Sequence, residues 1–171
     1  MNLFKIIVIL GLMFSALFGA TEDVPTQYGK KLAKVHYGWL SKYPTATLGI
    51  YTNSITKQFM SNDEISTYFK LRLRNFVSDV KIVKDPNSIS SSHNYIGITI
   101  QLEKYNDKLG IYFGLIEFII FPSLDSKSWE NYRITYSIAG NDGQIKSEIK
   151  SDIDSMVEKF ASDYFFIKDM K

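Results

Sequence analysis

The chain has 171 residues, of which 45% are hydrophobic and 22% charged, a composition typical of one globular domain and not of a disordered chain. Its 20 basic and 18 acidic residues leave a formal net charge of +2, which is too small for a nucleic-acid binder. The absence of cysteine excludes a disulfide framework, thiolate metal sites, iron–sulfur clusters and thiol catalysis. The unusual feature is an aromatic content of 15%, with 11 tyrosines and 12 phenylalanines.

The N-terminal segment has the pattern of a secretory signal peptide. Lys5 precedes an uncharged apolar run at residues 6–18, and two small residues follow it. The run is too short for a helix that crosses a hydrocarbon core of about 30 Å. We expect cleavage after Ala20. Cleavage after Gly19 or Ala16 is an alternative, and so is an uncleaved segment.

A helix is predicted between Pro25 and Pro44, at residues 26–43. Its apolar residues recur at steps of three and four and include Trp39, whereas lysines occupy the other face. The following segment, residues 48–55, is rich in β-forming residues and is predicted to be a strand.

A second helix is predicted from a capping box. Ser61 and Glu64 have the S-x-x-E spacing in which each side chain accepts a hydrogen bond from the other residue's backbone N–H. The helix is expected to end near Phe76 and to bury that side chain with the other apolar residues of one face. A short strand at residues 80–83 and a serine- and asparagine-rich loop at residues 85–94 follow.

The clearest strand pattern begins at residue 95. Isoleucine and leucine alternate with mostly polar residues over 95–103, which predicts a strand with one buried and one polar face. A hairpin loop at 105–108 leads to a second strand at 109–121. That strand is apolar on both faces except at Glu117, so we expect it to be central in the sheet or covered on both sides.

The C-terminal part combines one more strand with the strongest helix of the chain. Residues 132–138 alternate again, and a turn at 139–143 follows. Over residues 143–167 a single apolar stripe persists for the whole helix.

The predicted order is α-β-α-β-β-β-β-α, without βαβα repetition. We therefore predict an α+β fold with a mainly antiparallel sheet of about five strands, helices packed on one face, and an additional N-terminal helix. The predicted organisation is a signal peptide at 1–20 and a single α+β domain at 21–171. Within this domain the helix at 26–43 precedes a core at 48–167.

The sequence offers little chemistry. We predict no catalytic, cofactor-binding or metal-binding residue. His36 and His93 are not spaced as zinc ligands, and packing and solvation are the favoured interpretations of the two. Glu117 is costly to bury without a partner. The favoured interpretation is an exposed position or a pair with Arg133 on a neighbouring strand, and a catalytic acid is the alternative.

The aromatic excess predicts a protein-contact surface on the sheet, because tyrosine combines a large apolar area with a polar tip. Tyr95 draws attention because it falls on the polar face of its strand. The candidate contact residues are Trp39, Tyr51, Tyr95, Tyr112, Trp129, Tyr132 and Tyr136.

The element order resembles the small exported β-α-β-β-β-α modules of bacterial envelope assemblies, such as accessory factors of flagellar motors and of outer-membrane secretion. The similar features are the strand LGIYT, the passage YFKLRLRNFVSDVKIV, a long hairpin and the closing helix with VEKFASDYF. This resemblance implies a scaffolding or partner-binding role and carries over no catalytic residue.

The expected function is therefore that of a non-enzymatic periplasmic protein, a structural or accessory subunit of a cell-envelope assembly such as the flagellar motor. Protein partners in the envelope are expected and a homo-oligomer is compatible. Nucleic acid, cofactors and stable membrane insertion after signal cleavage are not expected. Two alternatives stay open: a small-ligand or cell-wall-binding module with a pocket between sheet and helices, and an esterase-like or glycosidase-like hydrolase.

Overall fold

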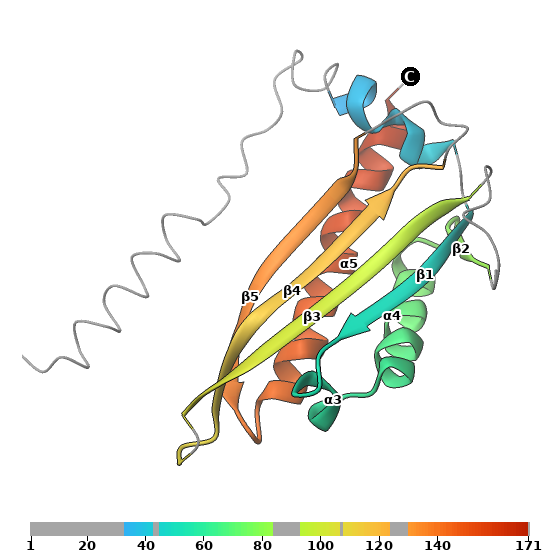
Figure 1. Cartoon of the computed structure of the whole chain (residues 1–171). Helices are drawn as coiled ribbons and strands as arrows, with labels where there is room; N and C mark the ends of the chain where they lie inside the picture. Colours follow the sequence, from blue (N-terminus) through green and yellow to red (C-terminus); the bar gives the residue numbers. More distant parts are fainter. Residues whose placement is uncertain (1–32, 43–44, 84–92, 107, 124–129, 171) are drawn as a thin grey trace, which may run out of the picture. The chain divides into compact units, whose positions relative to one another are not determined.

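The computed structural model describes residues 33–42, 45–83, 93–106, 108–123 and 130–170 (Figure 1). The predicted signal peptide and Trp129 lie outside these residues. So do residues 26–32 and 43 of the predicted N-terminal helix. Its described part is helical at residues 33–37 and continues as the 3-10 helix η1, Gly38–Ser41.

Five strands form one sheet in the order β2-β1-β3-β4-β5. Their bounds are Thr45–Thr52 for β1, Lys81–Ile82 for β2, Asn94–Asn106 for β3, Ile111–Phe121 for β4 and Tyr132–Asn141 for β5. The other described helices are α3, Thr56–Phe59; α4, Asn62–Phe76; and α5, Ile145–Asp169. The predicted α+β class and the number of strands are confirmed.

The predicted strand directions are wrong in part, because the sheet is mixed. β1 is parallel to both β2 and β3, whereas β3, β4 and β5 are antiparallel to one another. The parallel pair of β1 and β2 arises because α4 carries the chain back along the sheet before β2 begins. Strand direction does not alter which residues of a strand face the core, so the alternation pattern could not reveal it.

The first strand lies three residues earlier than predicted, and Asn53 explains where it ends. The Asn53 side-chain oxygen accepts hydrogen bonds from the backbone N–H and the hydroxyl of Thr56, at 2.9 and 2.8 Å. The Asn53 amide donates to the Leu102 carbonyl at 2.7 Å. These bonds turn the chain out of the sheet and start the short helix α3, which the sequence analysis missed.

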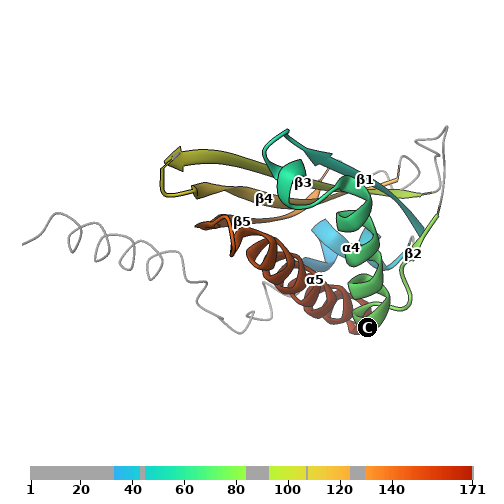
Figure 2. The same ribbon diagram turned by 90° about the horizontal axis from the view of Figure 1, so that it is seen from below.

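Helices α4 and α5 pack on the same side of the sheet (Figures 1 and 2). The predicted inner side of β3 is confirmed, since Ile96, Ile98, Ile100 and Leu102 are at most 1% exposed. The α5 stripe is buried along the whole helix, whereas Phe76 at the end of α4 is 37% exposed, contrary to prediction. The core therefore lies between one sheet face and two helices.

The predicted capping box at the start of α4 is confirmed. The Ser61 hydroxyl accepts from the Glu64 N–H at 3.2 Å, and a Glu64 carboxylate oxygen accepts from the Ser61 N–H at 2.9 Å. This last bond, together with Lys146 at 2.9 Å, lowers the pKa of Glu64 from 4.5 to about 2. Because the folded pKa lies below the unfolded one, the resulting stabilisation is complete above pH 4.5 and is lost as the pH falls toward 2.

Replacing Ser61 with alanine is expected to lower the free energy of unfolding by about 1 kcal/mol, because the Glu64 N–H loses its side-chain acceptor. Urea titration followed by circular dichroism measures this change. Ser66→Ala, in the interior of the same helix, is the matched control and should cost less. Equal losses in both variants would mean that the capping box contributes nothing particular.

Candidate functional site

The sheet face opposite the helices carries no described helix, and we call it the open face (Figure 2). Its side chains come from the odd-numbered residues of four strands, because the even-numbered ones face the core. They are Thr47, Gly49 and Tyr51 of β1; Tyr95, Gly97, Thr99, Gln101 and Glu103 of β3; Phe113, Leu115, Glu117, Ile119 and Phe121 of β4; and Arg133, Thr135, Ser137 and Ala139 of β5.

A row of side chains along β4, interrupted by Glu117 and the buried Ile119, includes three exposed apolar residues on this face. Phe121 is 43% exposed, Leu115 40% and Phe113 45%. Strand β4 is flanked by β3 and β5, as the prediction of a central strand requires. It is not covered on both sides, however, because these three side chains reach solvent.

At one end of the row, Tyr51, Tyr95 and Phe121 form an aromatic cluster beside Gly49. The Tyr51 and Tyr95 hydroxyls are hydrogen-bonded to each other, and the Tyr95 ring lies 6.3 Å from that of Phe121. A Cβ atom at Gly49 would lie 1.9 Å from the Tyr95 hydroxyl. Gly49 is therefore what allows the Tyr95 ring to lie across β1 and reach Tyr51. Burial, followed by the bond to Tyr51, raises the pKa of Tyr95 above its ordinary value.

A second aromatic pair closes the other end. Tyr105, 73% exposed, stands edge-on to Phe113 with 6.0 Å between ring centroids. We call the whole set the aromatic strip, and it consists of Tyr51, Tyr95, Phe121, Leu115, Phe113 and Tyr105.

The single carboxylate of β4 on the open face is paired. Arg133 Nε lies 3.3 Å from Glu117 Oε1, across the register in which Glu117 faces Thr135 and Arg133 faces Ile119. The predicted cross-strand pair is confirmed. The Glu117 side chain is 23% exposed, so the pair neutralises a charge in the middle of the strip.

The structure separates the seven predicted contact residues. Trp39, Tyr112 and Tyr132 are buried, at 5%, 4% and 7% exposure, and so offer almost no surface. Tyr136 is half-buried on the core side of β5. Tyr51 and Tyr95 lie together on the open face, and Trp129 falls outside the described residues.

Phe113, Leu115, Phe121 and Tyr105 were not among the predicted contact residues. The signal was present in the two apolar faces of the predicted strand 109–121, because two sheet faces cannot both be covered by helices that pack on one side only. When helices cover only one face of a sheet, a strand that is apolar on both faces exposes the apolar side chains of its other face.

The two histidines have separate partners. His36 Nδ1 is 2.5 Å from Glu130 Oε2, and His93 Nδ1 is 2.7 Å from the Thr45 hydroxyl. Within the described ranges, no three His, Asp or Glu side chains are grouped so that they could hold a metal ion. None of the described helices is long and apolar enough to cross a membrane.

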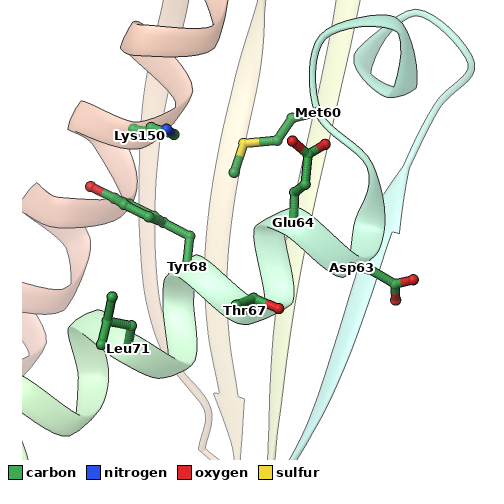
Figure 3. Close-up of a pocket in the computed structure, with 7 residues that line it drawn as sticks. All are labelled: Met60, Asp63, Glu64, Thr67, Tyr68, Leu71 and Lys150. Carbon is green, nitrogen blue, oxygen red and sulfur yellow. The ribbon is translucent and has the colours of Figure 1, made fainter.

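A groove of about 410 Å³ lies on the helical side, where α4 meets α5 (Figure 3). It is lined by Met60, Asp63, Glu64, Thr67, Tyr68, Leu71 and Lys150. Ion and ring contacts bridge the two helices here: Lys146 binds Glu64, and Lys150 Nζ stands 5.4 Å from the centre of the Tyr68 ring. The predicted position of a ligand pocket, between sheet and helices, differs from the position of this groove.

The described part of the chain is thus an α+β domain with a mixed five-stranded sheet, one face covered by helices and the other bearing an exposed aromatic strip. No protein-family model matches the sequence, and no curated protein matches it either.

Several solved structures of bacterial proteins resemble the domain in outline. One is PelC of Paraburkholderia phytofirmans, solved as a dodecamer, with a TM-score of 0.46 and 14% identity over 67% of this chain and 85% of that one. Others are a minor lipoprotein of Acinetobacter baumannii (TM-score 0.40, 13% identity, 71% of this chain and 91% of that one) and the rare lipoprotein B of Shewanella oneidensis (0.32, 14%, 70% and 90%). Likeness at this level carries no argument about what the chain binds or how it assembles.

Proposed function

We propose that this protein is an exported, non-catalytic protein of the cell envelope that binds a partner protein through its open face. One observation carries the proposal. On the open face, Phe113, Leu115 and Phe121 of β4 are 40–45% exposed, with Glu117 and the buried Ile119 between Leu115 and Phe121. Exposed large apolar side chains that are grouped on one face are a usual mark of a protein interaction site.

The surroundings of the strip support a protein partner. Polar residues border it on both sides, with Gln101 and Glu103 on β3 and Thr135 and Ser137 on β5. An apolar aromatic centre with a polar rim is the usual anatomy of an interface. The paired charges of Glu117 and Arg133 lower the cost of covering the centre, because each is already neutralised.

The cellular location in this proposal is the periplasm, and it rests on the signal-peptide pattern of the first twenty residues. The flagellar motor is the machine that we propose to test first as the host of the protein. The pattern of elements that resembles accessory factors of envelope assemblies motivates this choice.

Crosslinking from the open face tests the proposal in cells. A photoreactive amino acid placed at Tyr51 or Leu115 is expected to capture one reproducible envelope protein, identified by mass spectrometry. The matched control is Lys70, which is exposed on α4 on the opposite side of the domain. Capture from Lys70 but not from the open face would contradict the proposal, as would open-face probes that capture nothing.

Removing side chains from the strip should then weaken binding to the captured partner. Leu115→Ala and Phe121→Ala are each expected to weaken it by about fivefold or more, because well-covered interface side chains contribute over about 1 kcal/mol. Isothermal titration calorimetry measures the effect. Thr47→Ala, on the margin of the same face, is the control and should leave affinity within about twofold.

A second candidate function, a small-ligand or cell-wall-binding module, is favoured by the groove between α4 and α5, whose volume of about 410 Å³ falls in the range of ligand sites. Soluble cell-wall fragments would then shift the amide NMR signals of Thr67, Tyr68 and Lys150. Shifts confined to the groove would support this function in place of partner binding, and shifts on the open face would not.

A further inference from the structure

The outer edge of β5, with which no other described strand pairs, is the second unusual surface of the domain. Strand β5 pairs with β4 on one side and ends the sheet on the other (Figure 1). At ten residues it is long, whereas β2 at the opposite edge has only two. Half of the backbone N–H and C=O groups of an edge strand point away from its neighbour, and these groups can pair with another strand.

The composition of β5 does nothing to block such pairing. Edge strands are usually protected by lysine, proline, inward-pointing charges or short length. The sequence of β5, YRITYSIAGN, contains no proline and a single charged residue, Arg133. The Arg133 side chain is already paired with Glu117 at 3.3 Å. Five of its residues are of types enriched in strands: Tyr132, Ile134, Thr135, Tyr136 and Ile138.

We propose that β5 pairs antiparallel with β5 of a second copy of this chain, so that two five-stranded sheets become one continuous sheet. In a register centred on Tyr136, Ile134 faces Ile138 on the core side, and Thr135 faces Ser137 on the open face. Ile134 and Tyr136 are only half-buried at the margin of the core. The second copy covers both of them.

Charge favours the antiparallel direction of this pair. With Tyr136 at the two-fold axis, each Arg133 lies opposite Ala139, and the two arginines are separated along the strands by six residues, or about 20 Å. A parallel pair in register would place the two arginines side by side, which is destabilising. At the start of β5 the Tyr37 ring already packs against Tyr132, with 6.0 Å between ring centroids. The proposed pairing therefore begins at Arg133 and covers residues 133–139.

The two edges of the sheet also determine where assembly stops. A two-fold pair uses the same edge of both chains and closes on itself. At the remaining edge of each sheet, β2 pairs with only the first two residues of β1 and is too short to recruit a third copy. Farther along β1, the Asn62 side chain of α4 donates to the Ile50 carbonyl at 3.3 Å and so occupies part of that edge. The geometry therefore specifies a dimer, with both open faces on the same side. This inference does not depend on the identity or existence of the partner protein.

Cysteine crosslinking tests the pairing and its register, since the chain has no native cysteine. In an equimolar mixture of T135C and S137C, brief oxidation is expected to give a disulfide-linked dimer of one chain of each kind. Each variant alone should give much less of the linked dimer. In this register, the identical cysteines of two copies lie two residues apart along the paired strands. A mixture of T99C and Q101C on β3 is the matched control and should stay unlinked. Efficient linking of S137C to itself would move the axis to Ser137 and still support antiparallel self-pairing.

Charge insertion tests the dimer without crosslinking. The double variant T135K/S137K places lysine opposite lysine at two positions of the dimer but leaves both side chains in solvent in the monomer. We expect the dissociation constant to rise by roughly tenfold or more, measured by sedimentation equilibrium. T99K/Q101K, with the same charges on β3, should leave it unchanged.

Three results would overturn the inference: a monomer at all accessible concentrations, a dimer that neither crosslinks at β5 nor responds to T135K/S137K, or assembly that continues beyond two copies. Circular dichroism of T135K/S137K shows whether the variant is folded. If that variant does not fold, the cysteine mixtures decide alone. Loss of the partner protein's binding in the open-face variants leaves the dimer unaffected, so the two proposals fail separately.

Discussion

Replacing Phe118 with alanine is expected to lower the free energy of unfolding by about 3–5 kcal/mol. The Phe118 side chain is 1% exposed and packs against Phe69 of α4, Phe160 of α5 and Tyr132 of β5, with ring centroids 5.5–6.2 Å apart. The substitution opens a cavity where sheet and both helices meet, and three aromatic rings lose a neighbour. Urea-induced unfolding, followed by tyrosine and tryptophan fluorescence, measures the loss.

Phe113 of the same strand is the matched control for this prediction. It is the same residue type in β4 but points to the open face and is 45% exposed. Phe113→Ala is expected to cost less than about 1 kcal/mol, since little buried surface is lost. Similar losses for Phe113 and Phe118 would show that the orientation of β4 is wrong, and with it the assignment of the open face.

Replacing Gly114 with alanine is expected to destabilise the protein by about 3 kcal/mol. Side-chain rotation cannot relieve the clash of the new Cβ atom. A Cβ atom there would lie 1.9 Å from the Gln101 carbonyl oxygen and 2.9 Å from the Leu102 Cα. Both obstacles belong to the backbone of β3, so the strands themselves must separate. The melting temperature and the unfolding free energy of the variant report this cost.

Gly49 offers the contrasting control. A Cβ atom there would also come within 1.9 Å of another atom, but that atom is the hydroxyl of the Tyr95 side chain. Because a tyrosine on an open face can turn aside, Gly49→Ala is expected to cost only about 1 kcal/mol. The cost should shrink further in a Tyr95→Ala background. A Gly49 variant as unstable as the Gly114 variant would contradict this explanation.

The two proposed surfaces of the domain are chemically different and lie on different parts of it. The aromatic strip presents side chains from the middle of the sheet, and its affinity for a partner comes from covering apolar area. The β5 edge presents backbone hydrogen-bonding groups, and its selectivity comes from register. Pairing at the edge would place two strips on one side of the joined sheet, which would strengthen the binding of a partner with two matching sites.

Local patterns in the sequence predicted the parts of the fold that local physics decides. The capping box at Ser61 and Glu64 satisfies backbone groups within one turn of helix, so its spacing was enough. The inner side of β3 and the stripe of α5 follow from periods of 2 and 3.6 residues, and both were predicted from those periods. The pair of Glu117 and Arg133 was foreseen because an isolated carboxylate in an apolar strand needs a partner.

Only the tertiary structure decided which face of β4 meets the helices. Phe118 and Phe113 are both apolar, and alternation separates them into two sets without saying which set is covered. The directions of β1 and β2 were equally hidden, because parallel and antiparallel pairing leave the same side chains facing the core. The sequence alone therefore indicated the α+β class and the surplus of aromatic residues. Packing, which depends on contacts between distant segments, divided that surplus into a core around Phe118 and an exposed strip around Phe113, Leu115 and Phe121.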